Sequence, residues 1–421
     1  MKRIAVIGAG AAGCFCAAEL RRLRPEFRVD VYEAGPKPLA KVAVTGGGRC
    51  NLTNSFEGIR NLSEAYPRGD RLMKRLLRVF SQEDAWRWFE SAGVPLVLQD
   101  DHCVFPRSQN ALDIVHALLR RMEGANLLLR APVHSVIPGS TSSVIPGSTS
   151  SVIPGSTSSV IPGSTRNLLV DGEPYDAVVV TTGGAPKGLP MLEGLGLEWV
   201  PTVPSLFTFT IRDEGLRGLM GLVADASVSI PGTPFKADGP LLITDWGLSG
   251  PAVLKLSSYA ARYLHEAGYK APLIVNWLAL NEAETRETLQ AQAAENPRKQ
   301  VSNTPPAGLQ ARLWNHLIIK AGLRPDIRWA ELGTKGTNRL VATLTQDTYE
   351  IAGKTKFREE FVTCGGVALT NIDPSTLECK RHPGLYFAGE VLDIDAVTGG
   401  FNLQAAWSTG AVVARSLAAS Y

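Results

Sequence analysis

The sequence predicts an α/β fold with a parallel sheet, into which a second and mainly β part is inserted. Three stretches carry this prediction. A short apolar run leads into a glycine-rich turn and a helix at the start of the chain, a second buried run ends in Thr-Gly-Gly at 182–184, and a third ends in Gly-Glu at 389–390 before the last helix. Strands that alternate with helices in this way form parallel sheets.

The first 33 residues have the strand–turn–helix–strand pattern of a Rossmann-like, dinucleotide-binding unit. The run 4–7 predicts a strand buried on both faces, and a second strand at 28–32 ends in an acid 20 positions after the last glycine of GAGAAG. In such a motif the three glycines allow a tight turn, the approach of a pyrophosphate and close helix–strand packing. The helix N-terminus faces the phosphates and the acid accepts hydrogen bonds from ribose hydroxyls. The predicted contacts are Gly8, Gly10, Ala11, Ala12, Gly13 and Glu33.

Composition describes a soluble globular protein of two or three domains. The chain has 421 residues, 44% of them hydrophobic and 20% charged. Its 43 basic and 40 acidic residues give a formal charge of +3, which is too balanced to indicate nucleic acid as the main partner. No apolar run approaches the ~20 residues that span a bilayer, and Met1-Lys2-Arg3 leads directly into the first strand without a signal peptide. We expect a cytoplasmic protein without a membrane partner.

The six cysteines, at 14, 16, 50, 103, 364 and 379, show neither CxxC nor metal-type spacing. We therefore expect reduced thiols, no structural disulfide and no metal site.

A second glycine-rich stretch follows the first unit. Three consecutive glycines at 46–48, followed by Arg, Cys and Asn, favour neither helix nor strand, but they bring bare backbone and hydrogen-bond donors against a ligand. A flexible surface turn needs no such donor set. The predicted contacts are Lys41, Thr45, Gly46, Gly47, Gly48, Arg49, Cys50 and Asn51. Cys50 has two interpretations, as a packing residue or as a redox partner of the ligand.

The stretch GGGRCNLTN, placed about 30 residues after a GxGxxG motif, resembles the signature of the YhiN-like or BaiN-like bacterial flavoproteins. These proteins are described as NAD(P)/FAD-dependent oxidoreductases or aminoacetone-oxidase-family FAD-binding enzymes. The resemblance covers nearly the whole chain except a repeat at 135–165. It implies FAD in the first site, a glutathione-reductase-type domain, and a glycine loop close to the flavin.

The next elements are predicted in order as an amphipathic helical stretch at 70–93, short strands at 94–106, a helix at 111–123 and a strand at 126–133. In the flavoproteins that this chain resembles, the residue that ends such a strand often meets the adenine, which implies a contact from Val133.

The motif SVIPGSTS then occurs three times, at 135–142, 143–150 and 151–158, and a fourth copy begins at Ser159. A Pro-Gly pair every eight residues excludes long helices and central strands. We expect an expanded turn between strands at 127–133 and 167–171. The alternative is a recognition arm.

The buried run 176–181 ends in a Thr-Gly-Gly that resembles the second flavoprotein motif, where the chain crosses beside the dinucleotide. It implies contacts from Thr182, Gly183 and Gly184. Thr181 stands where alanine is common in that motif.

From about residue 195, short strands with Pro and Gly turns predict a small β-barrel or sheet domain. Residues 245–251 predict a helix start with Ser249 as its cap and Pro251 in its first turn. GLSGP at 247–251 also matches the family pattern, so the alternative is a role beside a substrate pocket. The stretch 281–323 is mostly helical, as is an insert in the family, and 340–352 is expected as a strand. The predicted domains are 1–193 plus 354–421 for FAD, 194–280 plus 328–353 for the β-barrel-like insert, and 281–327 for a helical subdomain.

The last stretch completes the predicted site. A strand leads to Gly389-Glu390, where many flavoproteins have Gly-Asp beside the ribityl chain and the YhiN-like family has Glu. A helix follows, and its N-terminus would stabilise charge on a reduced flavin. Its alternative role is only to dock on the sheet. The implied contacts are Gly389, Glu390, Gly399, Gly400, Phe401, Asn402 and Leu403.

These features predict an FAD-dependent oxidoreductase in which the flavin exchanges hydride, with no catalytic side chain identified. A second GxGxxG with strand context is missing from the sequence, so NAD(P)H would dock transiently and a small organic molecule would be the acceptor. Alternatives are an amine oxidase that is reoxidised by oxygen, a flavin-dependent RNA-modifying enzyme and a flavin-binding sensor. The balanced charge and the absence of CxxC argue against the RNA class. The substrate and the oligomeric state stay open.

Overall fold

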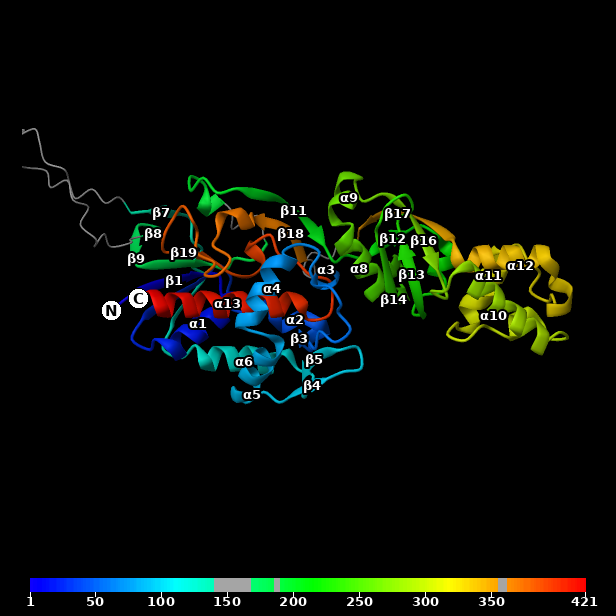
Figure 1. The fold of residues 1–421 in the computed structure, drawn as a ribbon, viewed down its shortest axis with the longest axis horizontal. Helices are drawn as coiled ribbons and strands as arrows, with labels where there is room; N and C mark the ends of the chain where they lie inside the picture. The colour runs from blue at the N-terminus through cyan, green and yellow to red at the C-terminus, as the bar shows by residue number, and fades with distance from the viewer. Residues whose placement is uncertain (140–167, 185–189, 355–361) are drawn as a thin grey trace, which may run out of the picture. The chain divides into compact units, whose positions relative to one another are not determined.

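The computed structural model describes residues 1–139, 168–184, 190–354 and 362–421. These residues form two compact units (Figure 1). Unit 1 consists of Met1–Thr202, Gly365–Asp395 and Gly399–Tyr421, and unit 2 of Val203–Cys364 and Ala396–Thr398. The main chain crossings therefore fall after Thr202 and Cys364, beyond the boundaries at 193 and 354 expected from the sequence. Strands β11 (Trp199–Ser205) and β18 (Val362–Val367) form a two-stranded sheet at these crossings.

The centre of unit 1 is a five-stranded parallel sheet, which confirms the predicted α/β fold. Its strand order is β19-β10-β1-β2-β6. These strands are β1 (Arg3–Ile7), β2 (Arg28–Glu33), β6 (Asn126–Leu129), β10 (Ala177–Val180) and β19 (Leu385–Phe387). The two central apolar runs, at 4–6 and 177–180, are fully buried, as expected of strands covered on both faces.

Three helices pack together beside this sheet. Helix α1 (Ala11–Leu23) contacts both α6 (Ala111–Arg121) and α13 (Phe401–Ser420). The approach of α13 to α1 is close, because a Cβ on Gly410 would lie 2.9 Å from the carbonyl oxygen of Ala12. This contact fixes the C-terminal helix against the helix that follows GxGxxG.

A second group of elements in unit 1 lies between β2 and β6 in the chain. It contains α2 (Ala40–Gly48), β3 (Thr53–Asn54), α3 (Leu62–Ala65), α4 (Asp70–Val79), α5 (Gln82–Ser91), β4 (Leu96–Leu98) and β5 (Cys103–Pro106). The single helical stretch expected at 70–93 is two helices. Ser81 separates them, because its side chain and that of Asp84 form a capping box that starts α5.

The start of the repeat is a strand. β7 (Val136–Pro138), within the first copy, pairs with β8 (Leu168–Val170), which pairs with β9 (Glu173–Tyr175). β7 is an edge strand of this sheet, where proline is tolerated. The expected turn between strands at 127–133 and 167–171 falls on residues 140–167, which lie outside the described residues, and the strand expected at 126–133 ends at Leu129 instead. The remaining copies, from 143 onward, lie outside the described residues.

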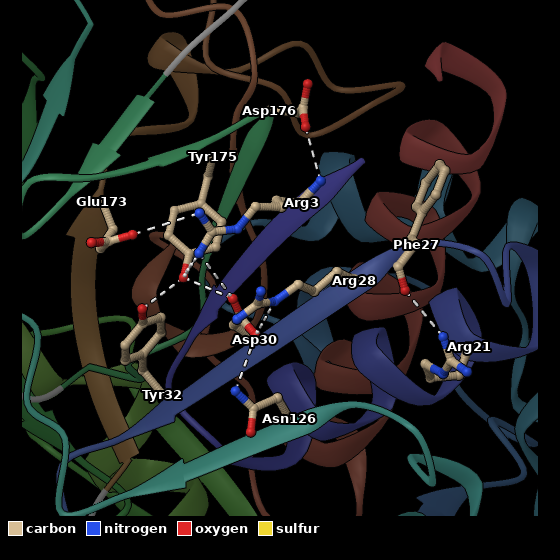
Figure 2. A network of polar contacts seen from close by, with 10 residues as sticks. All are labelled: Arg3, Arg21, Phe27, Arg28, Asp30, Tyr32, Asn126, Glu173, Tyr175 and Asp176. Carbon is tan, nitrogen blue, oxygen red and sulfur yellow. Dashed lines mark hydrogen bonds and ion pairs between the residues drawn. The ribbon is translucent and has the colours of Figure 1, made fainter. Parts of the chain in front are cut away.

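A buried carboxylate joins the amino ends of the parallel strands (Figure 2). Asp30, which is 1% exposed, accepts hydrogen bonds from Tyr175 Oη (2.9 Å), Asn126 Nδ2 (3.2 Å) and Arg28 Nε (3.2 Å). Arg3 Nη2 lies 3.5 Å from its second oxygen. Burial alone would raise the pKa of Asp30, but the hydrogen bonds from Tyr175, Asn126 and Arg28 hold it below its usual value.

Unit 2 is built on a closed six-stranded barrel, which confirms the predicted β-barrel-like insert. The strand order is β12-β15-β14-β13-β16-β17. The strands are β12 (Phe209–Ile211), β13 (Val223–Ser229), β14 (Lys236–Ile243), β15 (Gly247–Ser249), β16 (Ala271–Asn276) and β17 (Asp347–Lys354). Helix α8 (Pro251–Tyr259) packs against β13, β14 and β15.

The other helices of unit 2 share one continuous core with the barrel. They are α7 (Glu214–Arg217), α9 (Ala261–Glu266), α10 (Glu282–Glu295), α11 (Ala311–Lys320) and α12 (Trp329–Thr345). Short 3-10 helices lie at Pro190–Leu192, Val301–Asn303, Leu369–Asn371 and Gly389–Val391. The residues expected as a separate helical subdomain thus pack as part of unit 2.

Two local predictions in unit 2 are wrong. The strand expected from residue 340 begins only at Asp347, because Leu340, Val341 and Leu344 form the buried side of α12. Ser249 lies in β15 and does not cap α8. The cap position belongs to Gly250, whose φ is +91° and whose Cβ would lie 2.7 Å from the carbonyl oxygen of Pro240.

Within the described ranges, no helix combines the length and apolar character needed to cross a membrane. All six cysteines lie in the described residues and are buried, and no disulfide joins any two of them.

Candidate functional site

The turn between β1 and α1 packs tightly against the end of β10. Gly8 has a φ of +108°, and a Cβ there would lie 2.6 Å from the carbonyl oxygen of Thr181. A Cβ on Gly13 would overlap the carbonyl oxygen of Gly8 and lie 2.5 Å from Thr181 Oγ1. The Thr181 hydroxyl donates to Gly8 O (2.7 Å) and to Ile7 O (3.0 Å). Two of the three predicted glycines are therefore required by the protein's own packing.

Gly10 differs, because no described protein atom would lie within 4 Å of a Cβ at this position. It is the N-cap of α1, no side chain caps this helix, and its first turn holds no acid. The first backbone N–H groups of a helix lack intrahelical partners and attract anions. Ala11 and Ala12 carry two of these groups. The open space and the donors together fit a pyrophosphate.

Glu33 is held at the end of β2. Its two carboxylate oxygens accept hydrogen bonds from the backbone N–H groups of Ala9 (3.1 Å) and Gly35 (2.7 Å). A carboxylate oxygen can accept more than one hydrogen bond, so each retains capacity for a ribose hydroxyl. The structure thus fixes the Glu33 carboxylate at the end of β2, and its contact with a sugar stays a prediction.

The neighbouring loop corrects the prediction for Val133. Because β6 ends at Leu129, Val133 does not end the strand and its contact with a ligand stays a prediction. Arg130 N donates to Gly35 O (3.0 Å) and Ala131 N donates to Glu33 O (2.8 Å). No motif identifies this Arg130–Ala131 segment, because its place depends on where the strand ends.

The end of β10 contributes a buried hydroxyl. Thr182 Oγ1 is inaccessible to solvent and has no hydrogen-bond partner among the described residues. Buried hydroxyls in native proteins usually have a hydrogen-bond partner, and a ligand bound at the end of β10 would supply one to Thr182. Gly183 follows with a φ of +70°, and its Cβ would lie 3.5 Å from Glu390 Oε2. The buried Gly184 ends this described stretch.

The Gly389–Glu390 turn lies next to the same helix start. A Cβ on Gly389 would lie 2.8 Å from the Cβ of Ala12, and Gly389 N donates to Thr409 Oγ1 on α13 (2.9 Å). Lys41 Nζ lies 3.6 Å from Glu390 Oε2. The structure therefore brings the GxGxxG turn, the Thr182–Gly184 stretch, Lys41 and Glu390 together, although they are far apart in the sequence.

The glycine loop is irregular in the way that its composition predicts. Helical geometry is lost at Thr45, whose ψ is 147°, and Gly46, Gly47 and Gly48 have φ values of +58°, +67° and +82°. Such values favour glycine strongly. The helical residues from Ala40 to Val44 were not expected from the sequence.

The loop is fixed by its polar neighbours. The Arg49 guanidinium lies over the Phe105 ring, 4.6 Å from its centroid. The hydrogen-bond partners of Asn51 assign its amide orientation, in which Nδ2 donates to Thr53 O (3.0 Å) and Oδ1 accepts from Gly400 N (3.2 Å). Asn51 thereby links the loop to the start of α13.

Cys50 is buried within this loop, and burial raises the pKa of its thiol to about 12. A thiol with such a pKa is protonated and a poor nucleophile at neutral pH. This favours the packing interpretation of Cys50 over a redox role.

The start of α13 is clamped onto the loop. Gly400 has a φ of +88°, and a Cβ there would overlap the carbonyl oxygen of Thr53. Asn54 Nδ2 donates to Gly399 O (3.0 Å), and Tyr66 Oη donates to Phe401 O (2.9 Å). Phe401, Asn402 and Leu403 form the first turn, which contains no acid.

Sequence reasoning missed the supporting side chains Asn54, Tyr66 and Gln404. Thr53 Oγ1 donates to Gln404 Oε1 at 2.6 Å. No motif identifies them, because their role is to hold backbone segments that only the fold brings together.

Comparisons with known proteins agree with this geometry. The model of the HI0933-like protein Rossmann domain matches residues 2–416. The chain is 31% identical to the ribosomal RNA dihydrouridine synthase of Escherichia coli (strain K12), over 99% of this chain and 98% of that protein. It is 26% identical to the 3-dehydro-bile acid delta(4,6)-reductase of Clostridium scindens, over 99% of each.

Among solved structures, a 3-ketosteroid delta1-dehydrogenase from Sterolibacterium denitrificans is similar over the full length of both chains, with a TM-score of 0.47 and 14% identity. The full-length match to the family model, together with the 31% identical relative, settles the family. The chain belongs to the HI0933-like Rossmann-domain family of FAD-dependent oxidoreductases.

Proposed function

We propose that this protein is a flavin-dependent reductase of carbon–carbon double bonds conjugated to a carbonyl group, with NAD(P)H as the electron donor. One observation carries the reaction class. Two relatives that match the chain over nearly its whole length are named for different substrates, a ribosomal RNA and a 3-dehydro bile acid, yet both names describe the addition of hydrogen across such a bond.

The overall chemistry balances without another reactant. Dihydrouridine is uridine with hydrogen added across its C5–C6 double bond, which is conjugated to the C4 carbonyl. The bond receives a hydride equivalent and a proton, and NAD(P)H becomes NAD(P)⁺. A bound FAD would supply a two-electron centre that separates donor oxidation from acceptor reduction in time.

The chain's own residues would bind and orient this cofactor. The N–H groups at the start of α1 would bind the pyrophosphate beside Gly10, Glu33 would accept from a ribose hydroxyl, and Thr182 Oγ1 would gain a partner. The N-terminus of α13, without an acid in its first turn, would place positive potential near negative charge on the ring.

This reaction also explains why a reactive cysteine is not needed. Reduction of a conjugated double bond requires a hydride and a proton, and no covalent bond to sulfur. Cys50, with its raised pKa of about 12, fits this expectation. The absence of CxxC therefore does not count against an RNA substrate.

The test is an anaerobic absorbance titration of the flavin-bound protein with NADH and then NADPH. We expect the visible band of oxidised flavin to bleach with one of them. Addition of unmodified ribosomal RNA, or of a steroid enone, should then restore the band without oxygen. The corresponding saturated compounds serve as controls and should restore nothing.

A band that bleaches with amines but with neither nicotinamide would contradict the proposal. That outcome would support the amine oxidase interpretation instead. A band that no donor bleaches would indicate a flavin-binding sensor.

A further inference from the structure

Helix α4 concentrates positive charge on one face. Its four basic residues, Arg71, Lys74, Arg75 and Arg78, are all exposed, while Leu72, Met73 and Leu76 are buried. The spacing i, i+3, i+4, i+7 places the four cations on one side of the helix. The only acid of α4 is Asp70, its first residue. This single helix therefore has the same net charge, +3, as the whole chain.

No acidic side chain in the described part of the protein forms an ion pair with any of these four cations, whereas α1 and α5 each contain an internal ion pair. Arg22 pairs with Glu19 in α1, and Arg87 pairs with Asp84 in α5. Like charges at i+3 and i+4 destabilise a helix. Each such like-charge pair costs the helix a few tenths of a kcal/mol, so a negatively charged partner on this face would stabilise α4.

Helix α4 is fixed within the same unit as the dinucleotide site. Arg68, just before it, forms a bidentate ion pair with buried Asp395, and Tyr66 donates to Phe401 O at the start of α13. At its other end, Arg415 Nη1 of α13 donates to Val79 O (2.6 Å) and adds a fifth exposed cation. Figure 1 shows α4 beside α13, with which it is in contact.

We propose that the α4 basic face, defined as Arg71, Lys74, Arg75, Arg78 and Arg415, binds the phosphate backbone of an RNA whose uridine is reduced at the flavin site. This inference rests on the proposed function and specifies its substrate class. The four helical cations span about 10 Å along the axis, which suits successive phosphates of a strand.

The chemistry of the face favours RNA over a small enone. Arginine binds phosphate oxygens with a planar fork of donors, and lysine adds a point charge. A steroid acid carries one carboxylate and cannot neutralise five cations. The balanced charge of the whole chain, which indicated no nucleic-acid partner, does not report how that charge is distributed.

The test compares two variants of the full-length, flavin-bound protein. In the first, Arg71, Lys74, Arg75 and Arg78 are all replaced by glutamine, which has nearly the same helix propensity. In the control, Arg298→Gln, Lys299→Gln, Lys335→Gln and Arg339→Gln remove the same charge from exposed positions of unit 2. Fluorescence anisotropy measures binding of a labelled single-stranded oligouridylate over a series of salt concentrations.

We expect the α4 variant to bind the oligouridylate at least about tenfold more weakly. The plot of log K against log salt concentration should also become less steep, by about 0.7 for each phosphate contact that is lost. The control should bind as wild type does. Equal losses in both variants, or unchanged binding by the α4 variant, would overturn the inference. If the fourfold variant does not fold, Arg71→Gln with Arg78→Gln gives the same comparison at the two ends of the face.

Flavin reduction separates this inference from the proposed function. Bleaching by NAD(P)H and reoxidation by a small enone should be unchanged in the α4 variant, because these steps do not use the basic face. If the wild type binds RNA through α4 but shows no turnover, the proposed function fails and only RNA binding by the α4 basic face stands. If the enzyme reduces a small enone but does not bind RNA, the proposed function stands and the inference about the α4 basic face fails.

Discussion

The two ends of the parallel sheet in unit 1 are built in opposite ways. At the amino ends, the Asp30 carboxylate is buried and receives hydrogen bonds from three side chains. At the carboxyl ends, the Thr182 hydroxyl is buried without a partner among the described residues, and Gly10 faces open space. At the amino edge the protein's own side chains satisfy the buried carboxylate, although Arg3 Nε beside it lacks a partner among the described residues. At the carboxyl edge the unpartnered hydroxyl lies on the side where the backbone N–H groups of α1 begin. Ligands of open α/β sheets bind at the carboxyl edge.

The largest expected effect comes from Gly13→Ala, where the new Cβ would overlap the carbonyl oxygen of Gly8. Because backbone must move, we expect a loss of about 4 kcal/mol or more in the free energy of unfolding, together with loss of bound flavin. Chemical denaturation and the flavin absorbance measure both. Gly353→Ala is the control, since its Cβ would meet nothing within 4 Å; equal losses in the two variants would contradict the packing argument.

Asp30→Asn should have the next largest effect, and this effect should be on the free energy of unfolding alone. It leaves a buried cluster without its charge, which costs about 3 kcal/mol, while flavin affinity of the folded protein stays unchanged. Because the pKa of Asp30 is lowered in the folded state, its contribution is present above the ordinary value of about 4 and is lost as the pH falls below it. Urea unfolding at several pH values should show the difference between wild type and variant shrinking in acid. A weaker flavin affinity in the folded variant would contradict the view that the amino edge of the sheet serves stability and not cofactor binding.

The adjacent threonines at the end of β10 give a smaller and sharper contrast. Thr181 Oγ1 donates to Ile7 O and Gly8 O, so Thr181→Val should reduce stability by about 1 kcal/mol. Thr182→Val removes a hydroxyl without a protein partner and should leave stability unchanged or higher, but weaken FAD binding about five- to tenfold. Scanning calorimetry of protein stripped of flavin measures the stability, and titration calorimetry of the same protein with FAD measures the affinity. If Thr182→Val instead destabilises the protein, its hydroxyl has a structural role.

The smallest effect is expected for Cys50→Ala. With a pKa raised to about 12 by burial, this thiol is protonated at every pH near neutrality, so the rate of flavin reduction by NAD(P)H should not change. Stopped-flow absorbance measures that rate, and alkylation by iodoacetamide should leave Cys50 unmodified below about pH 10. A large fall in the reduction rate would restore the redox interpretation.

Local motifs predicted the dinucleotide turn well, because Gly8, Gly13 and Glu33 act within one short strand–turn–helix–strand unit. Features that depend on tertiary structure were missed or misplaced. Val133 was assigned from a strand that ends earlier, and Ser249 was assigned to a cap that Gly250 occupies. That the Thr182 hydroxyl has no hydrogen-bond partner among the described residues could not be predicted from the sequence, because it depends on the tertiary structure.

The distribution of charge is a second feature that the sequence analysis missed. Arg71 and Arg78 are plain in the sequence, but the total charge of +3 concealed their concentration on one helix face. The periodicity that predicted one apolar side of this helix also implies an opposite side, where these cations lie, but the prediction did not extend to it. Counting charge over each helix, and not over the chain, would have identified it.

Gly10→Ala tests the central claim most directly. The backbone there (φ −84°, ψ −167°) accepts alanine, and the Cβ would meet no described protein atom within 4 Å. If this space belongs to the pyrophosphate of FAD, the variant should unfold at the same temperature as wild type when both lack flavin, yet bind FAD at least about 100-fold more weakly, which corresponds to ~2.8 kcal/mol. Unchanged FAD affinity would contradict the claim that the carboxyl edge of this sheet is the cofactor site.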